Sequence, residues 1–156
     1  MAPPTLFPGS LLADPLYTEI KITKDGPKVV ELGARLGGDN ITTYLTPLST
    51  GVDMVESCIR IALGETADLE PKFHKASAIR YFRVEQGFIR DIRGLEEARK
   101  IPGVKQIYVV HGIGEKMNGI KSSGDRSGFV IAQADTAEKA VEICEKALDL
   151  IEIEME

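Results

Sequence analysis

The sequence contains little of what would identify an exported, membrane-bound or nucleic-acid-binding protein. It has two cysteines, Cys58 and Cys144, which are far apart, so we expect no structural disulfide and a reducing cytoplasm as the setting. The net charge is −5 and no cluster of basic residues opposes it, which leaves no attractive surface for nucleic acids or anionic membranes. No apolar run is long enough for a signal peptide or a membrane span. These absences predict a cytoplasmic protein that binds neither nucleic acid nor membrane.

The sequence also lacks the residue patterns of several common active sites. His74 and His111 have no cysteine or histidine partner at ligand spacing, so neither a zinc site nor a Ser-His-Asp triad is supported. Segment 111–128 has five glycines and two lysines, one of them Lys116, but not the G-x-x-x-x-G-K-[ST] spacing of a phosphate-binding loop. We interpret this segment as a surface loop.

Length and composition predict a globular protein with one core or two small lobes. The chain has 156 residues, of which 43% are hydrophobic and 28% are charged. Prolines are frequent at the start of the chain, which predicts an irregular arm over residues 1–14. We place a first lobe at residues 15–70 and an α+β lobe at residues 71–156, because the segment around this boundary has the composition of a connection.

Residues 15–36 alternate between apolar and polar side chains on either side of a turn, which predicts a β-hairpin. A two-residue loop at 25–26 would put Glu19 and Glu31 on opposite faces of this hairpin. A three-residue loop at 24–26 would put Glu19 directly across from Glu31. The hydrophobic pattern favours the three-residue loop, because that register collects the apolar side chains on one face.

The favoured register places Thr23 opposite Pro27 and gives the hairpin an apolar face and a polar face. We expect the apolar face to lie in a core; it carries Leu16, Thr18, Ile20, Ile22, Val30, Leu32, Ala34 and Leu36. The polar face carries Tyr17, Glu19, Lys21, Glu31, Gly33 and Arg35. Carboxylates that face each other across two strands repel, and a hard cation such as Mg²⁺ between them would turn that repulsion into binding. The alternative is that the polar face is exposed to water and that the fold tolerates the repulsion between the two glutamates.

A short loop of Gly37, Gly38, Asp39 and Asn40 follows Arg35. All four are turn-forming residues, so a plain turn is one interpretation. The other is a binding loop, because glycines let the backbone approach a ligand and backbone amides can point at anionic oxygens.

The rest of the chain predicts helices and further strands. One helix should run over 51–63, begin with a cap at Thr50 and Asp53, and end at Gly64. Its apolar residues cover nearly the whole circumference, which is typical of a helix buried on more than one side. In the second half we predict strands over 77–84, 87–94, 104–113 and 128–134, and helices over 95–101 and from about 136, the last capped by Asp135 and Glu138.

These segments together resemble a known superfamily. Glu19, the segment ELGARLGG that starts at Glu31, and the following TGVDMVESCIRIALGE resemble the closing part of the ATP-grasp fold. The segment RSGFVIAQADTAEKAVEICEKAL resembles the C-terminal lobe of L-amino acid ligases and related carboxylate–amine ligases, and more distantly that of biotin carboxylase. The resemblance runs from about residue 15 to the C-terminus. It implies an α+β fold: the C-terminal half of an ATP-grasp domain, with helices packed on an antiparallel sheet, followed by a small α+β lobe.

The resemblance implies roles for the residues of the polar face and of the glycine loop. Glu19 and Glu31 would bind Mg²⁺, with Mn²⁺ as an alternative, on the phosphates of ATP. Arg35 would stabilise negative charge on the transferring phosphoryl group or acyl phosphate. The backbone amides of Gly37 and Gly38 would contact a bound carboxylate.

The chain departs from the family in two respects. The family commonly has asparagine where this chain has Gly33, so one side-chain contact to the metal is missing. Whole enzymes of this kind also have an N-terminal domain and a lid lobe, and nothing before residue 15 resembles either. The chain therefore resembles the last third of such an enzyme, as a split subunit, a truncated product or a fragment. Its partner would be the missing lobes, and apolar surface left exposed would favour that partner or self-association.

The implied reaction is activation of a carboxylate as an acyl phosphate by ATP and magnesium, followed by attack of an amine to form an amide or peptide bond. Small-molecule carboxylates and amines would be the substrates, and the chain alone would be incomplete as an enzyme. One alternative is a fragment of an enzyme like carbamoyl-phosphate synthase or biotin carboxylase. The other is a non-catalytic remnant that only binds a partner chain or a small ligand.

Overall fold

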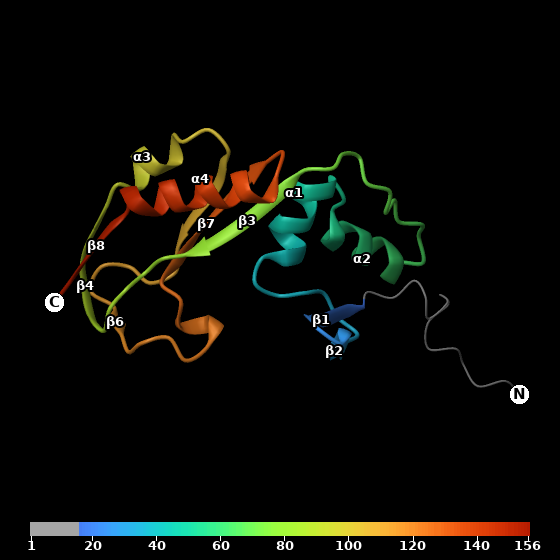
Figure 1. The fold of residues 1–156 in the computed structure, drawn as a ribbon, viewed down its shortest axis with the longest axis horizontal. Helices are drawn as coiled ribbons and strands as arrows, with labels where there is room; N and C mark the ends of the chain where they lie inside the picture. The colour runs from blue at the N-terminus through green and yellow to red at the C-terminus, as the bar shows by residue number, and fades with distance from the viewer. Residues whose placement is uncertain (1–15) are drawn as a thin grey trace, which may run out of the picture. The chain divides into compact units, whose positions relative to one another are not determined.

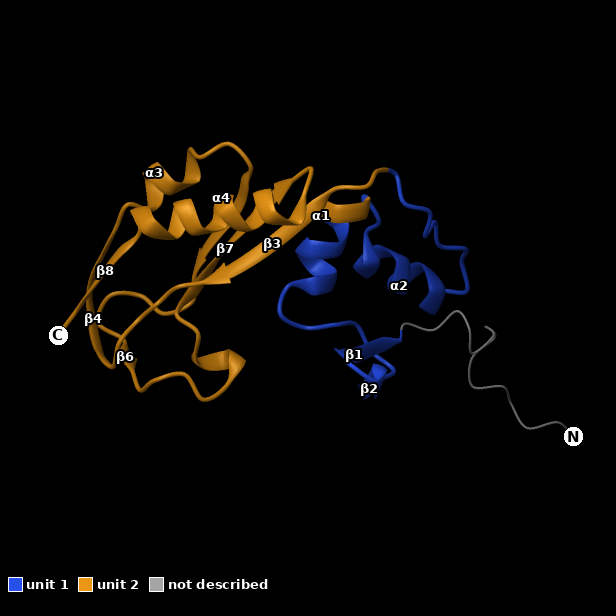
Figure 2. Cartoon of the chain, viewed as in Figure 1, with its two compact units in different colours: residues 1–47, 51–72 blue, residues 48–50, 73–156 orange. Residues whose placement is uncertain are grey.

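A computed structural model describes residues 16–156, so the arm expected over residues 1–14 lies outside the described residues. The chain divides into two compact units (Figures 1 and 2). Within the described residues, unit 1 contains 16–47 and 51–72, and unit 2 contains 48–50 and 73–156.

Unit 1 begins with an antiparallel hairpin, and short helices follow it. The hairpin consists of β1 (Tyr17–Thr23) and β2 (Gly26–Gly33). After the glycine loop come a π-helical turn, η1 (Ile41–Leu45), the short helix α1 (Thr46–Thr50), which continues into unit 2, and helix α2 (Met54–Ala62). The predicted hairpin is therefore present.

The pairing of Glu19 with Glu31 is confirmed, but it arises differently from the prediction. Thr23 pairs with Gly26 rather than with Pro27, so the connection is two residues long. A β-bulge between Glu19 and Ile20 then shifts the register by one residue. Because a bulge inserts one extra residue into one strand, the pairing beyond it is the one that a longer loop would give.

The expectation that the apolar face of the hairpin lies in a core is wrong for this chain. The larger apolar residues of the hairpin are exposed to solvent: Leu16, Ile20, Ile22, Val29, Val30 and Leu32. Ile22, for example, is 79% exposed. Alternation shows that these side chains suit a buried face, but a two-stranded hairpin supplies no second layer to cover them.

Helix α2 differs from its prediction in both its cap and its burial. Its N-cap is Asp53, whose side chain accepts a hydrogen bond from the Glu56 amide, so Thr50 is not the cap. Val55, Ile59 and Leu63, spaced four residues apart, form an exposed apolar stripe instead of a buried one. The helix does end near Gly64, whose φ of +76° suits a residue without a side chain.

Unit 2 contains two antiparallel three-stranded sheets, with strand orders β3-β7-β5 and β6-β4-β8. The strands are β3 (Ala76–Tyr81), β4 (Gly87–Arg93), β5 (Val104–Val109), β6 (Lys116–Met117), β7 (Gly128–Ala134) and β8 (Glu152–Met155). The helices are α3 (Leu95–Arg99), a 3-10 turn η2 (Ser123–Asp125) and α4 (Ala137–Leu150). The four predicted strands and both predicted helices are present, whereas the short strands β6 and β8 were not predicted.

Helix α4 packs against β3 and β7 and forms the core of unit 2 with them (Figure 1). Ala140, Cys144 and Ala147 are fully buried on this face of the helix. The cap of α4 is Thr136, whose hydroxyl accepts from the Lys139 amide, and not the expected Asp135. No helix within residues 16–156 combines the length and the hydropathy needed to cross a membrane.

Gly94 provides a test of the packing between β4 and the end of α4. Its φ is +80°, and a Cβ atom added there would lie 1.7 Å from the carbonyl oxygen of Leu150. We expect Gly94→Ala to lower the free energy of unfolding by more than about 2 kcal/mol, measured by urea denaturation. Gly112 has open space around it, so Gly112→Ala is the control and should change stability by less than about 0.5 kcal/mol. Equal effects of the two variants would contradict this packing.

Cys144 provides a test of burial in the core. Burial raises the pKa of its thiol to about 11, so the folded state resists formation of the thiolate. The stability contributed by the neutral thiol is complete below the unfolded pKa and is lost as the pH rises through the folded one. Between pH 8 and pH 10 we expect wild type to lose about 1 kcal/mol more unfolding free energy than Cys144→Ala, measured by urea denaturation. Parallel pH profiles for the two proteins would contradict the burial.

Candidate functional site

The hairpin brings together the three charged residues that the sequence singled out. Glu19 on β1 lies directly across from Glu31 on β2. The Nη2 atom of Arg35 lies 3.0 Å from Oε1 of Glu31, and the two side chains are 55% and 50% exposed. An ion pair this exposed contributes only about 0 to 1 kcal/mol, so a ligand can compete for either partner.

Arg35 also contacts groups outside this ion pair. Its Nη1 atom donates a hydrogen bond of 3.0 Å to the Leu36 carbonyl. Its guanidinium carbon lies 5.1 Å from the centre of the Tyr17 ring. The Tyr17 hydroxyl in turn is 3.5 Å from Oε2 of Glu19, at the limit of a hydrogen bond. Tyr17 was placed on the polar face from the alternation of the strand, but nothing in the sequence indicated its contact with Arg35.

The glycine loop folds into a turn that leads into η1. The Gly37 carbonyl accepts a hydrogen bond from the buried Thr42 hydroxyl, and the Gly38 carbonyl accepts one from the Ile41 amide. Asp39 and Asn40 have left-handed backbone conformations, with φ of 50° and 63°. Both interpretations of the loop stay open, since a turn built on carbonyl acceptors is compatible with amides that contact a ligand.

The donor set fits a metal shared with phosphates better than a metal held by protein alone. Within residues 16–156, no group of three or more His, Cys, Asp or Glu side chains is placed to hold a metal ion. Glu19 and Glu31 therefore supply two carboxylates at most. Mg²⁺ is commonly bound by one or two carboxylates together with substrate phosphates and water, so the pair fits that ion in the presence of a nucleotide.

Segment 111–128, which we interpreted as a surface loop, contains β6 and is organised by one carboxylate. Asp125 accepts hydrogen bonds from the amides of Lys121 and Ser122 and from the Ser122 hydroxyl. These bonds, led by the Lys121 amide, lower the pKa of Asp125. His111 lies 3.0 Å from a Glu115 carboxylate oxygen. All these contacts lie within the segment itself, so they account for its fold and indicate no ligand.

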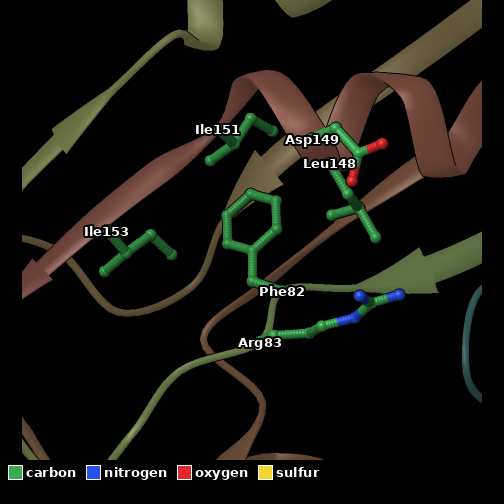
Figure 3. A pocket seen from close by; sticks show the side chains of 6 residues that line it. All are labelled: Phe82, Arg83, Leu148, Asp149, Ile151 and Ile153. Carbon is green, nitrogen blue, oxygen red and sulfur yellow. The ribbon is translucent and has the colours of Figure 1, made fainter.

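A small cavity of about 60 Å³ lies in unit 2, where α4 passes into β8. Its lining is Phe82, Arg83, Leu148, Asp149, Ile151 and Ile153. Figure 3 shows the Phe82 ring facing Leu148 and Ile151, whereas the Arg83 side chain extends away from the ring. Arg83 pairs with Glu145 at 2.7 Å. None of the site residues predicted from the sequence lines this cavity. The cavity is large enough for no more than a few water molecules.

Comparison with known proteins shows which proteins this chain is similar to. Residues 80–156 match the model of the L-amino acid ligase C-terminal domain 2. An L-amino acid ligase from Bacillus licheniformis superposes with a TM-score of 0.75 at 23% identity, over 90% of this chain and 36% of that one. A phosphoribosylglycinamide synthetase from Anaerococcus prevotii gives a TM-score of 0.77 at 16% identity, over 90% and 37%. This chain is therefore similar to the C-terminal part of the ATP-grasp ligases.

Two sequence relatives match most of this chain. A phosphoribosylamine–glycine ligase from Methanocaldococcus jannaschii is 30% identical over 146 residues, which cover 90% of this chain and 32% of that protein. An uncharacterized protein from Sinorhizobium fredii is 31% identical over 141 residues, covering 88% and 29%. The chain therefore spans about a third of the length of these curated relatives.

This similarity confirms the predicted resemblance to ATP-grasp ligases and the predicted α+β fold with antiparallel sheets and packed helices. It does not test the residues of the site. The roles given to Glu19, Glu31, Arg35, Gly37 and Gly38 stay predictions, supported by the geometry of the hairpin.

The ion pair between Arg35 and Glu31 can be tested by cation binding. Arg35 occupies a carboxylate oxygen that a metal would use, so its removal should raise the affinity of the hairpin for Mn²⁺. We expect Arg35→Gln to bind Mn²⁺ about fivefold more tightly than wild type in a water-proton relaxation titration. Arg60→Gln is the matched control, because Arg60 pairs with Glu56 and Glu65 elsewhere in unit 1.

Two results of this titration would contradict the prediction. Unchanged or weaker binding by Arg35→Gln would show that the guanidinium does not compete with the metal. A gain of the same size in Arg60→Gln would show that the effect comes from net charge and not from the Glu31 contact.

Proposed function

We propose that this chain forms the C-terminal part of an ATP-dependent ligase that joins a carboxylate to an amine. The observation that carries the proposal is the pair Glu19 and Glu31 on facing strand positions, with Arg35 beside them, in a chain related to ATP-grasp ligases. In the reaction, the carboxylate takes the γ-phosphoryl group of ATP and ADP leaves; the amine then attacks the acyl phosphate, loses a proton and displaces phosphate to form an amide or peptide bond. Catalysis of this kind depends mainly on positioning and on neutralising negative charge.

Each residue of the site has a role in this proposal. Glu19 and Glu31 bind Mg²⁺, or Mn²⁺, together with the phosphates of ATP. When bound, the metal neutralises the charge of those phosphates. Arg35 presents a positive charge to the acyl phosphate, where negative charge develops, and the amides of Gly37 and Gly38 contact the substrate carboxylate. Gly33 contributes no ligand, so metal binding depends on the two carboxylates more strongly than in relatives with asparagine there.

The names of the relatives support a proposal for the substrate class. The proteins similar to this chain are named L-amino acid ligase and phosphoribosylamine–glycine ligase, and both names contain an amino acid. We therefore propose an amino acid as the carboxylate and a small molecule as the amine. A cytoplasmic setting, with both cysteines reduced, suits such a reaction.

The exposed apolar surfaces of unit 1 fit a partner. They are the hairpin face with Ile20, Ile22 and Leu32 and the stripe of α2 with Ile59 and Leu63. Apolar patches of this kind on a folded unit are typical of interaction sites. We propose that the N-terminal and lid lobes of the ligase cover them, whether on the same polypeptide or on a separate chain.

A second candidate is a biotin-carboxylase-like reaction. A biotin carboxylase domain from Hydrogenobacter thermophilus, solved with MgADP and bicarbonate, superposes with a TM-score of 0.63 at 21% identity. We rank this candidate second, because that domain superposes less well on this chain than the L-amino acid ligase does. ATP hydrolysis that depends on bicarbonate, rather than on an amino acid, would reverse the order.

Calorimetry with Mg²⁺ and a non-hydrolysable ATP analogue tests the proposal. We expect the chain to bind the analogue weakly and only with Mg²⁺, and Glu31→Gln to lose at least about tenfold in affinity, because one of two carboxylates is neutralised. Glu65→Gln is the control, since Glu65 is an exposed carboxylate of unit 1 outside the site. Absent binding, or binding that Glu31→Gln leaves unchanged, would contradict the proposed site.

A further inference from the structure

Tyr17, Gly33 and Arg35 form a cluster at the end of the hairpin that the proposed catalytic roles leave unexplained. Tyr17 is the strand partner of Gly33, and the Arg35 guanidinium lies 5.1 Å from the centre of the Tyr17 ring. Contact between an arginine and an aromatic face is attractive, because the guanidinium is positive and the ring face is negative. Arg35 is thus held by an uncharged side chain as well as by Glu31.

Two glycines leave the space that this contact needs. A Cβ atom on Gly33 would lie 3.3 Å from Cγ and 3.5 Å from Nε of Arg35. A Cβ atom on Gly37 would lie 3.0 Å and 3.2 Å from two carbons of the Tyr17 ring. Neither glycine has a positive φ, so the backbone conformation does not require glycine at either position. Their small size therefore reflects the space taken by Arg35 and by Tyr17.

We propose that Tyr17 is a positioning residue for Arg35, and that Gly33 and Gly37 are glycines because the Tyr17–Arg35 pair fills the space beside them. The inference rests on the proposed function, in which Arg35 faces an anionic acyl phosphate. An asparagine at Gly33 would place its Cβ atom 3.3 Å from Cγ of Arg35, so the stem of Arg35 would have to move by a few tenths of an ångström.

The contact with Tyr17 matters most when a cation binds. Arg35 forms an ion pair with one carboxylate oxygen of Glu31, and a bound metal would contact the same carboxylate. A metal at Glu31 removes this attraction and adds repulsion between two positive charges. The Tyr17 ring and the Leu36 carbonyl do not change with the charge of Glu31, so they keep the guanidinium beside the metal, where it can meet an anionic group.

Side-chain NMR of the full chain tests the contact without any ligand. The proton on Nε of Arg35 should be shifted upfield by the ring current of Tyr17. We expect Tyr17→Phe to keep this shift, because the ring remains, and Tyr17→Leu to lose it. The Nε proton of Arg60, which pairs with Glu56 and Glu65, is the internal reference and should not move.

Gly33→Asn tests the space beside Arg35 in the same spectra. We expect it to move the Arg35 signal to the position seen in Tyr17→Leu, because the added side chain displaces Arg35. Gly38→Ala is the matched control, since a Cβ atom there meets no atom within 4 Å. An unshifted Arg35 signal in wild type, or one that Tyr17→Leu and Gly33→Asn leave in place, would overturn the inference.

Binding of the magnesium–ATP analogue separates this inference from the proposed function. We expect Tyr17→Phe to bind like wild type and Tyr17→Leu to bind about three- to fivefold more weakly, because Arg35 is no longer held near the phosphates. Equal affinities for wild type and Tyr17→Leu would overturn the positioning role while the proposed function stands. No binding by wild type would instead overturn the proposed function, and the functional part of the inference with it.

Discussion

The cross-strand pairing of Glu19 with Glu31 is the constraint on which the site depends. It places two carboxylates side by side at an energetic cost, and the nearby cations are the groups that offset it. In this chain Arg35 does so for Glu31. The bulge between Glu19 and Ile20 is as important as the strands, because a hairpin with the same two-residue connection and no bulge would pair different residues.

Much of the fold could be predicted from local pattern. The alternation of apolar and polar residues predicted the hairpin and the strands of unit 2, and helical periodicity predicted α4. Both patterns indicate which side chains of a single element are buried. The turn was mispredicted because a short loop with a bulge and a longer loop produce the same Glu19–Glu31 pair. Strands β6 and β8 were not predicted, because segments of two and four residues are too short to show a hydrophobic period.

Other features could not be predicted because they depend on what surrounds an element. The apolar residues of α2 indicate a surface that suits burial, but whether Ile59 is covered depends on groups outside the helix. Of the site, the carboxylate pair and Arg35 followed from spacing and resemblance. The contact of Tyr17 with Arg35 did not, because Arg35 lies beyond the end of β2 and its direction is set in three dimensions.

The most direct measurement is Mn²⁺ titration of the chain with the non-hydrolysable ATP analogue present, observed by NMR, because the ion broadens the signals of nearby amides. If the two glutamates hold the metal, the amides of Glu19, Glu31 and their strand neighbours broaden first, at the lowest Mn²⁺ concentration. Broadening that begins elsewhere, for example around Glu115 and Asp125, or that is spread evenly over the exposed carboxylates, would contradict a metal site on the hairpin.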